Sequence, residues 1–184
     1  RDMAKLVSKT YGDALFELAV SENNLAAITD EVHCFLDILH QNDDMNTMLS
    51  GDGVSKEEKW EFIKNVFDGR LSDIMMGFLN IAIEKGRSSD IESILDYFSD
   101  RAREYNKIGV AHITSAVSLT EAQKKQIKDR LLQVTDFVDY ETEYEVDEKL
   151  IGGLVIRIGD RVFDSSVKNR IEKMQRSLTK IQLN

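Results

Sequence analysis

The sequence predicts a mostly α-helical protein of two domains: an all-α helical bundle over residues 1–106, then a small α+β domain over residues 107–184. Three observations predict this fold. Apolar residues recur at helical spacing through the first part, they alternate at every second position after residue 106, and the net charge changes at the same place. A chain of 184 residues that is 42% hydrophobic is long and apolar enough for two small cores.

The charge is unevenly divided. Residues 1–107 carry 12 Lys or Arg and 21 Asp or Glu, whereas residues 108–184 carry 12 of each, so the whole formal charge of −9 lies in the first part. An acidic surface repels phosphate backbones, and we therefore expect no nucleic-acid partner for that part. Because charge and periodicity change together, the domain boundary is expected near Tyr105–Ile108.

Five long helices are expected in the first domain. Their residues are 4–20, 24–40, 55–67, 71–85 and 89–105, with a short helical turn within 41–54. Capping boxes at Ser55–Glu58 and Ser89–Glu92 open two of them. The segment 71–85 is apolar around most of its circumference, which predicts the buried central helix of a bundle.

The second domain is expected in the order β-α-β-β-β-α. A strand at 108–117 precedes a helix at 120–134, which a third capping box opens. The strand 139–148 alternates acidic and apolar residues, which predicts one acidic outer face. Gly159-Asp160 suits a two-residue turn between strands 154–158 and 161–163. The last helix has a basic side, which fits a nucleic acid, an anionic membrane, a solvated face or an answer to the acidic strand.

No constellation for catalysis stands out. His33 and His40 are seven residues apart, too far along one helix for the usual metal pair, and Cys34 points about 100° away from His33. Gly152-Gly153 is not followed by the Gly-Lys-Ser/Thr of a phosphate loop, and it borders a hairpin instead. No apolar run approaches the roughly 20 residues that span a bilayer. We therefore expect a binding protein that is not an enzyme, with no catalytic residue, cofactor or metal and no direct membrane insertion.

Several ordered motifs resemble a known family. Residues 151–160 (IGGLVIRIGD), followed by Asp164-Ser165-Ser166 and a closing amphipathic helix, resemble the C-terminal signature of the delta subunit of rotary ATP synthase. The mitochondrial counterpart is the oligomycin-sensitivity-conferring protein. Residues 11–16 (YGDALF), 78–87 and 110–120 continue the resemblance in order over nearly the whole chain. The segment 49–54 departs from it, because it lacks an expected proline.

The resemblance implies a stator subunit that links the catalytic head to the peripheral stalk and resists rotor torque. Its helical domain would bind the amphipathic N-terminal segment of an alpha subunit, and its second domain the C-terminal ends of the b subunits. It would sit on the cytoplasmic face of a bacterial plasma membrane as a peripheral protein. The alternatives are a helical adaptor unrelated to ATP synthase and an enzyme whose site no motif reveals.

The resemblance also places the alpha-binding groove between the first and fifth long helices, residues 4–20 and 89–105. On the first helix, Tyr11, Ala14, Leu15 and Leu18 are expected to form the main apolar face. Phe16 and Tyr97 lie off the main faces of their helices, so they either pack internally or anchor the partner. The predicted partner-binding residues are Tyr11, Ala14, Leu15, Phe16 and Tyr97.

Overall fold

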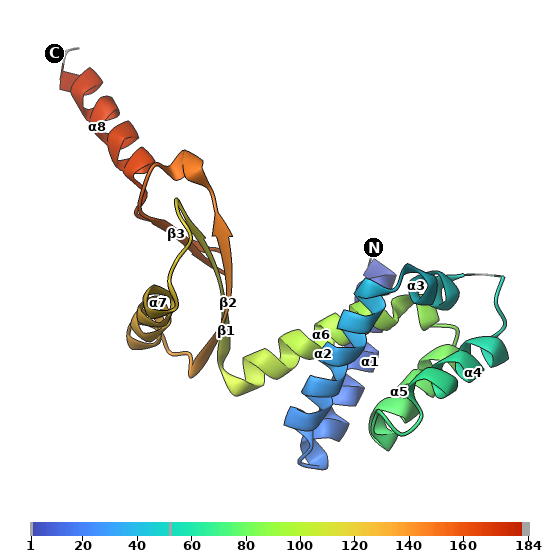
Figure 1. Ribbon diagram of the computed structural model, residues 1–184. Helices are drawn as coiled ribbons and strands as arrows, with labels where there is room; N and C mark the ends of the chain where they lie inside the picture. Colours follow the sequence, from blue (N-terminus) through green and yellow to red (C-terminus); the bar gives the residue numbers. More distant parts are fainter. Residues whose placement is uncertain (1, 52, 182–184) are drawn as a thin grey trace. The chain divides into compact units, whose positions relative to one another are not determined.

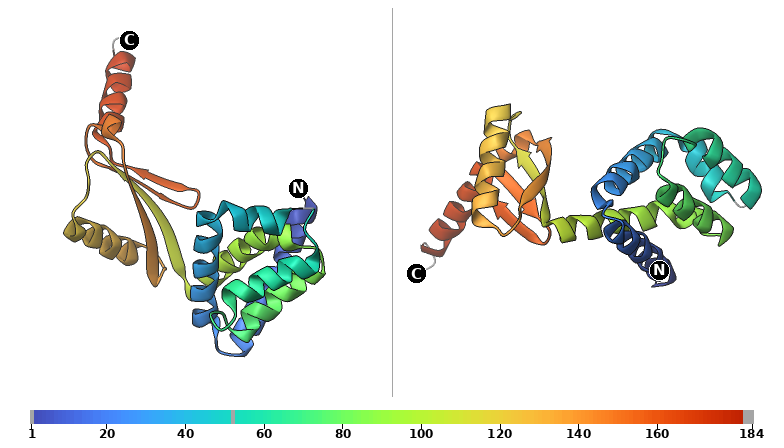
Figure 2. Two further views of the ribbon diagram at one scale, coloured as in Figure 1. Left: turned by 45° about the vertical axis from the view of Figure 1, so that its right-hand side comes forward. Right: turned by 90° about the horizontal axis from the view of Figure 1, so that it is seen from below.

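A computed structural model describes residues 2–51 and 53–181, with side chains described for residues 5–51 and 53–174 (Figures 1 and 2). The chain divides into two compact units, Arg1–Arg103 and Glu104–Asn184, here called unit 1 and unit 2. Unit 1 is helical, and unit 2 holds a small sheet with helices. The predicted fold class, a helical bundle followed by an α+β part, is confirmed.

Unit 1 contains six α-helices and one 3-10 helix among the described residues. They are α1 (Asp2–Ser21), α2 (Leu25–Gln41), α3 (Asp43–Ser50), α4 (Lys56–Phe67), α5 (Asp73–Glu84), η1 (Ser88–Asp90) and α6 (Ile91–Asn106). All of them except η1 contribute buried apolar side chains to one continuous core. Its largest fully buried members include Phe35, Ile63, Met75 and Phe98. Unit 1 thus encloses its own hydrophobic centre.

Of the two capping boxes that the sequence predicts in unit 1, one is present and one is not. The capping box at Ser55 is confirmed, because the Ser55 hydroxyl accepts from the Glu58 amide while the Glu58 carboxylate accepts from the Ser55 amide. The backbone bond of Ser55, and then its hydroxyl, hold the pKa of Glu58 below its usual value. The expected box at Ser89–Glu92 is wrong: η1 runs directly into α6 at Ile91, which leaves no capping residue between them.

Helix α5 is held at both ends by side chains of other helices. Its capping residue Ser72 donates to the Glu31 carboxylate of α2 through its amide (3.0 Å) and its hydroxyl (2.8 Å). At the other end, Lys56 Nζ of α4 donates to the Glu84 carbonyl at 2.7 Å. An anion near the N-terminus and a cation near the C-terminus both suit the helix dipole. The prediction of a buried central helix is confirmed for Met75, Phe78, Leu79, Ala82 and Ile83 but not for Ile81, which was counted with its apolar side and is 50% exposed.

Unit 2 follows the predicted element order. After α6 come β1 (Ile108–Ser115), α7 (Glu121–Val134), β2 (Asp139–Val146), η2 (Glu148–Leu150), β3 (Leu154–Ile158), β4 (Arg161–Asp164) and α8 (Val167–Ile181). The sheet order is β2-β1-β3-β4, with β1 parallel to β2 and antiparallel to β3. Pairing of Ile158 with Arg161 confirms the two-residue turn at Gly159-Asp160. Helix α8 extends away from the sheet (Figure 1).

In the described part of the chain, one face of the sheet is covered by a helix and the other is not. Helix α7 packs against the face that holds Ala111, Ile113 and Tyr140, and Leu131 is its buried contribution. On the opposite face the carboxylates of β2 form an exposed row along the edge of the sheet, as the alternation predicted. The row comprises Asp139, Glu141, Glu143 and Glu145. Unit 2 is therefore a two-layer structure with a much smaller core than unit 1.

Candidate functional site

Helices α1 and α6 approach closely through small side chains. Ser8 and Ser93 share a hydroxyl hydrogen bond of 3.0 Å. One turn further along α1, a Cβ on Gly12 would lie 2.5 Å from Tyr97 Cδ1 and 3.3 Å from the Ile94 carbonyl oxygen. The Tyr97 ring therefore occupies the space that any larger residue at position 12 would need. Gly12, which reads as a flaw in a helical pattern, is what lets α6 pack here.

Phe16 continues the same contact. Its side chain is only 8% exposed, and its ring meets Phe98 edge-on with centroids 6.4 Å apart. The Arg101 guanidinium lies 5.4 Å from the Phe16 ring centroid, within range of a cation–π interaction. Asp13 joins the two helices as well, because it accepts from the Tyr97 hydroxyl at 3.0 Å and lies 3.5 Å from Arg101 Nε.

The predicted inward face of α1 is only partly confirmed, because Leu15 is buried and Tyr11 packs against the core, whereas Ala14 and Leu18 are exposed. The buried positions are Ser8, Gly12, Leu15, Phe16 and Ala19. Leu15 and Phe16, two of the predicted partner-binding residues, belong to the core of unit 1. Tyr97 is half-buried and bonded to Asp13. Of the predicted set, Ala14 is exposed and Tyr11 is half-buried, so these two remain accessible.

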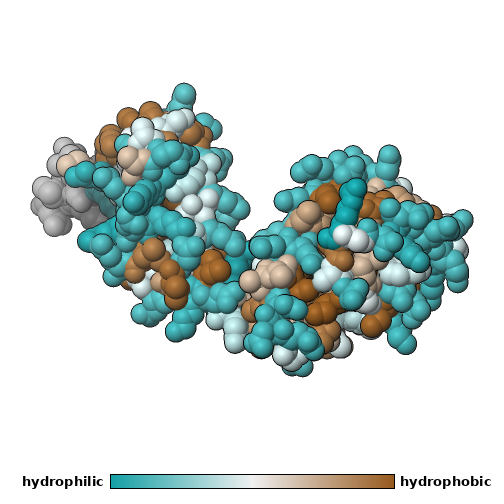
Figure 3. Space-filling view, turned by 60° about the horizontal axis from the view of Figure 1, so that its bottom comes forward, coloured by the Kyte–Doolittle hydropathy of each residue, from teal (hydrophilic) through white to brown (hydrophobic). Residues whose placement is uncertain are grey.

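An apolar strip lies on one flank of α1, where Ala14 and Leu18 are exposed and Tyr11 is partly buried against the core. We call it the α1 strip: Tyr11, Ala14 and Leu18, spaced by three and four residues so that they share one side of the helix. Leu18 is 44% exposed, although the sequence pattern assigned it to the core. Ile81 of α5 is exposed as well, and Figure 3 shows apolar side chains gathered on the side of unit 1 that this view brings forward. Such a surface suits an amphipathic helix.

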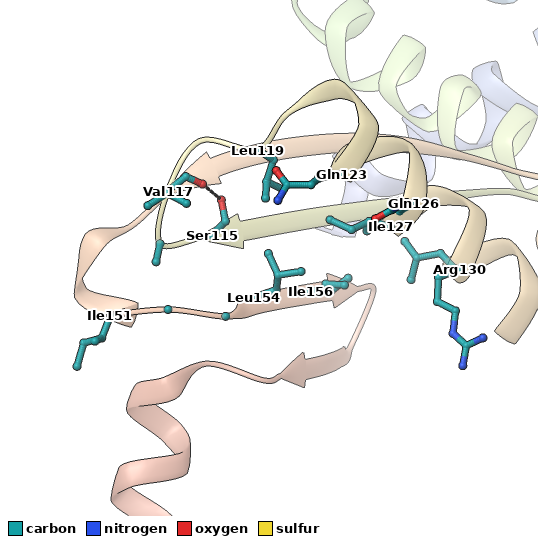
Figure 4. A pocket seen from close by; sticks show the side chains of 14 residues that line it. Ser115, Val117, Leu119, Gln123, Gln126, Ile127, Arg130, Ile151, Leu154 and Ile156 are labelled. Carbon is teal, nitrogen blue, oxygen red and sulfur yellow. Dashed lines mark hydrogen bonds between the residues drawn. The ribbon is translucent and has the colours of Figure 1, made fainter.

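A second apolar surface is a groove in unit 2, between α7 and β3 (Figure 4). Its volume is about 650 Å³. The side chains of Ile127, Leu154 and Ile156 project into it, and Gln123, Gln126 and Arg130 line its α7 side. Arg130 is the one charged residue among the residues that line it. No sequence signal marked this groove, because the run 154–158 reads as an ordinary buried strand.

The Gly152-Gly153 motif closes one end of the groove and fixes the start of α8. A Cβ on Gly153, whose φ is +82°, would lie 2.5 Å from the Ser165 carbonyl oxygen, and one on Gly152 would lie 3.1 Å from Val167 Cγ2. The Val167 amide donates to the Gly152 carbonyl, and the Ser165 amide to that of Leu154, both at 2.9 Å. The glycines therefore admit a close backbone approach between this loop and the first turn of α8.

Several titratable groups of the described chain form close pairs. His40 lies 2.8 Å from Glu92, and His112 lies 2.8 Å from Glu143. Among the described side chains, no three of His, Cys, Asp or Glu lie close enough together to hold a metal ion. Burial, and then repulsion from Glu92, raise the pKa of Asp96 above its ordinary value. No helix in the described part of the chain has the length and apolar character to cross a membrane.

A helical unit and an α+β unit, each with an exposed apolar surface, define a protein that binds other proteins. Comparison with known proteins gives the family. The family model described as ATP synthase delta (OSCP) subunit matches residues 7–178, and the chain belongs to that family. The ATP synthase subunit delta of Lachnoclostridium phytofermentans is 48% identical over 181 residues, which cover 98% of this chain and 100% of that protein.

Two further similarities agree with this assignment. The ATP synthase subunit delta of Synechocystis is 31% identical over 94% of this chain and 93% of its own length. A chain in the cryo-EM structure of the Toxoplasma gondii mitochondrial ATP synthase hexamer shares the fold. Its TM-score is 0.74 at 18% identity, over 94% of this chain and 97% of that one. The expected family is confirmed, and an adaptor unrelated to ATP synthase is not favoured.

Proposed function

We propose that this chain is a stator subunit that ties the catalytic head of a rotary ATP synthase to its peripheral stalk. In this proposal unit 1 binds the amphipathic N-terminal segment of an alpha subunit, and unit 2 binds the C-terminal ends of the b subunits. The chain contributes affinity and stiffness under torque and no catalytic chemistry. Anchored through the complex, it lies on the cytoplasmic face of a bacterial plasma membrane without inserting into it.

The observation that carries the proposal is the α1 strip. Leu18 and Ala14 are exposed on a helix whose other side is built into a complete core, so burial within unit 1 does not explain them. The formal charge of −9 within residues 1–107 favours a partner segment with cationic side chains beside its apolar face. The earlier set of five partner residues is thereby revised to Tyr11, Ala14 and Leu18, with Ile81 as a further anchor.

Titration calorimetry of the full chain with an alpha N-terminal peptide tests this. Leu18→Ala should weaken binding about fivefold to thirtyfold, which corresponds to ~1–2 kcal/mol of contact free energy. Leu6→Ala is the matched control, because Leu6 is 63% exposed on the same helix and about 120° away from Leu18. Its affinity should stay within about twofold of the wild type. Equal losses for the two variants, or no binding by the unmodified chain, would contradict the proposal.

We further propose that the two units are separately folding domains, residues 1–106 and 107–184. The division into compact units at Arg103 and the end of α6 at Asn106 support a boundary there. A 1–106 fragment should be helical and unfold cooperatively, and limited proteolysis should cut near residues 105–108. An unfolded 1–106 fragment would rule out this division.

A further inference from the structure

One loop of unit 2 holds its backbone under strain. Ile151, in the segment between β2 and β3, has φ +67° and ψ −34°. The left-handed region suits glycine, asparagine and aspartate, and it is crowded for a side chain that branches at Cβ. Asn23 and Lys107 are the other non-glycine residues with positive φ in the described chain, and neither of them is branched at Cβ. The strain at Ile151 therefore needs a cause.

Packing of the Ile151 side chain does not compensate for this strain. The residue is 68% exposed, so its side chain buries little apolar surface within unit 2. Strained backbone persists where the surrounding structure fixes the chain on both sides. The cause of the strain must therefore lie in the hydrogen bonds that hold the loop at its two ends.

The first end of the loop is tied to the sheet. The Asp147 amide, just after β2, donates to the Ser115 carbonyl of β1 at 2.8 Å, and the Asp147 carboxylate accepts from the Lys149 amide at 3.0 Å. The Ile151 amide then donates to the Glu148 carbonyl at 3.1 Å. These bonds close the short helix η2 and fix the direction in which the chain enters Ile151.

The second end of the loop is tied to the start of α8. The Gly152 carbonyl accepts from the Val167 amide, and the Leu154 carbonyl accepts from the amide and the hydroxyl of Ser165, all at 2.9 Å. The close backbone approach at Gly152 and Gly153 leaves little room for the loop to shift while α8 keeps this position. The chain after Ile151 can therefore relax only if the first turn of α8 leaves the loop.

We propose that Ile151 is the strained part of a latch that fixes the first turn of α8 on this loop and can release it. In the latched state, which the structure shows, the bonds at Gly152 and Leu154 hold α8, and Ile151 keeps its positive φ. In the released state these bonds are open, Ile151 has a negative φ, and the sheet and α7 stay folded. The strain lowers the free-energy difference between the two states, so α8 can change direction without unfolding of unit 2.

Hydrogen exchange of the full chain, followed by NMR, tests whether α8 is released locally. The Val167 amide bonds to the loop, whereas Ile113 lies in the buried centre of the sheet and is 1% exposed. The protection factor of the Val167 amide should be at least about tenfold lower than that of the Ile113 amide, because α8 leaves the loop while the sheet stays folded. Equal protection of the two amides would mean that α8 is released only when the whole of unit 2 unfolds, and it would overturn the latch.

Two substitutions at one position test the role of the strain. Ile151→Asn removes the branched Cβ from a left-handed position that asparagine tolerates, so it should stabilise the latched state and slow exchange of the Val167 amide about threefold to tenfold. Ile151→Val is the matched control, because it keeps the branched Cβ, and it should leave that rate within about twofold. The side chain is exposed, so both variants should fold. Exchange at Val167 that is unchanged or faster in Ile151→Asn, or equally slowed in both variants, would overturn the coupling between Ile151 and α8.

Discussion

Units 1 and 2 differ in how much of their apolar surface they bury by themselves. Among the described residues, the core of unit 1 contains 23 buried apolar side chains, whereas that of unit 2 contains Ala111, Ile113, Leu131 and Tyr140. Six helices can surround a centre, but one helix cannot cover four strands. Unit 1 therefore buries its apolar core within itself and exposes only an apolar strip of α1, whereas unit 2 leaves part of the apolar face of its sheet exposed.

The largest effect is expected in unit 1. Phe16→Ala should lower the free energy of unfolding by about 3–4 kcal/mol, because it removes a buried ring that packs on Phe98. Trp60, the only tryptophan, lies in α4 and makes fluorescence in urea a reporter of unit 1 alone. Leu18→Ala, on the exposed strip, should cost less than about 1 kcal/mol. A Phe16→Ala chain that stays stable and only loses affinity for the alpha peptide would instead support Phe16 as a partner-binding residue.

The next largest effect is expected from partner binding, which should stabilise the unit that binds and leave the other unchanged. With a C-terminal fragment of the b subunit at about one hundred times its dissociation constant, opening of unit 2 should cost about 2.7 kcal/mol more, and unit 1 should not change. Hydrogen exchange measured by mass spectrometry resolves the two units in one experiment. The alpha peptide should give the reverse pattern. Equal protection of both units by either partner would contradict the prediction that each partner stabilises one unit.

Two equivalent helix caps provide a finer comparison. Thr120 and Gln123 form the same reciprocal capping box on α7 that Ser55 and Glu58 form on α4. Ser55→Ala and Thr120→Ala should each cost about 1 kcal/mol in their own unit. Because the core of unit 2 is smaller, the same loss should open a larger fraction of its molecules. Hydrogen exchange of α4 and α7 checks this, and equal open fractions would argue against a weaker unit 2.

The smallest effect concerns Asp96 of α6, whose carboxyl pKa is raised by burial and by Glu92. A raised pKa means that the folded state disfavours the charged form, so charging costs stability above the folded pKa. Asp96→Asn should therefore stabilise unit 1 slightly at pH 7. The gain should vanish near pH 3, where the carboxyl is protonated in both states. Urea unfolding at the two pH values measures it, and a gain that persists at pH 3 would exclude this cause.

Much of the fold follows from local chemistry in the sequence. The capping boxes at Ser55 and Thr120, the turn at Gly159-Asp160 and the acidic alternation of β2 all appear as expected. Each depends on residues within a few positions of one another, so the sequence shows its cause directly. The order of elements in unit 2 follows from these signals.

The inward face of α1 could not be predicted from the local sequence, for a physical reason. Its buried face includes Ser8 and Gly12, which a hydrophobic pattern does not count, whereas the flank with the half-buried Tyr11 and the exposed Ala14 and Leu18 has equally good apolar spacing. What decides between the faces is the approach of α6, which needs small residues opposite Tyr97. That contact joins positions about 85 residues apart, and no local pattern contains it. For the same reason Leu15 and Phe16, two of the predicted partner-binding residues, lie in the core.

The carboxylate row of β2 affects how free copies of the chain associate with one another. An edge strand has unpaired backbone groups that can pair with another strand, and two copies meeting along β2 would bring their carboxylate rows together, with Asp139 in each row paired to Lys128. Their repulsion disfavours fibril-like stacking of free subunits at neutral pH and weakens as acid neutralises the row. The acidic edge of unit 2 therefore disfavours strand-to-strand association of free chains, in which the apolar groove between α7 and β3 is exposed.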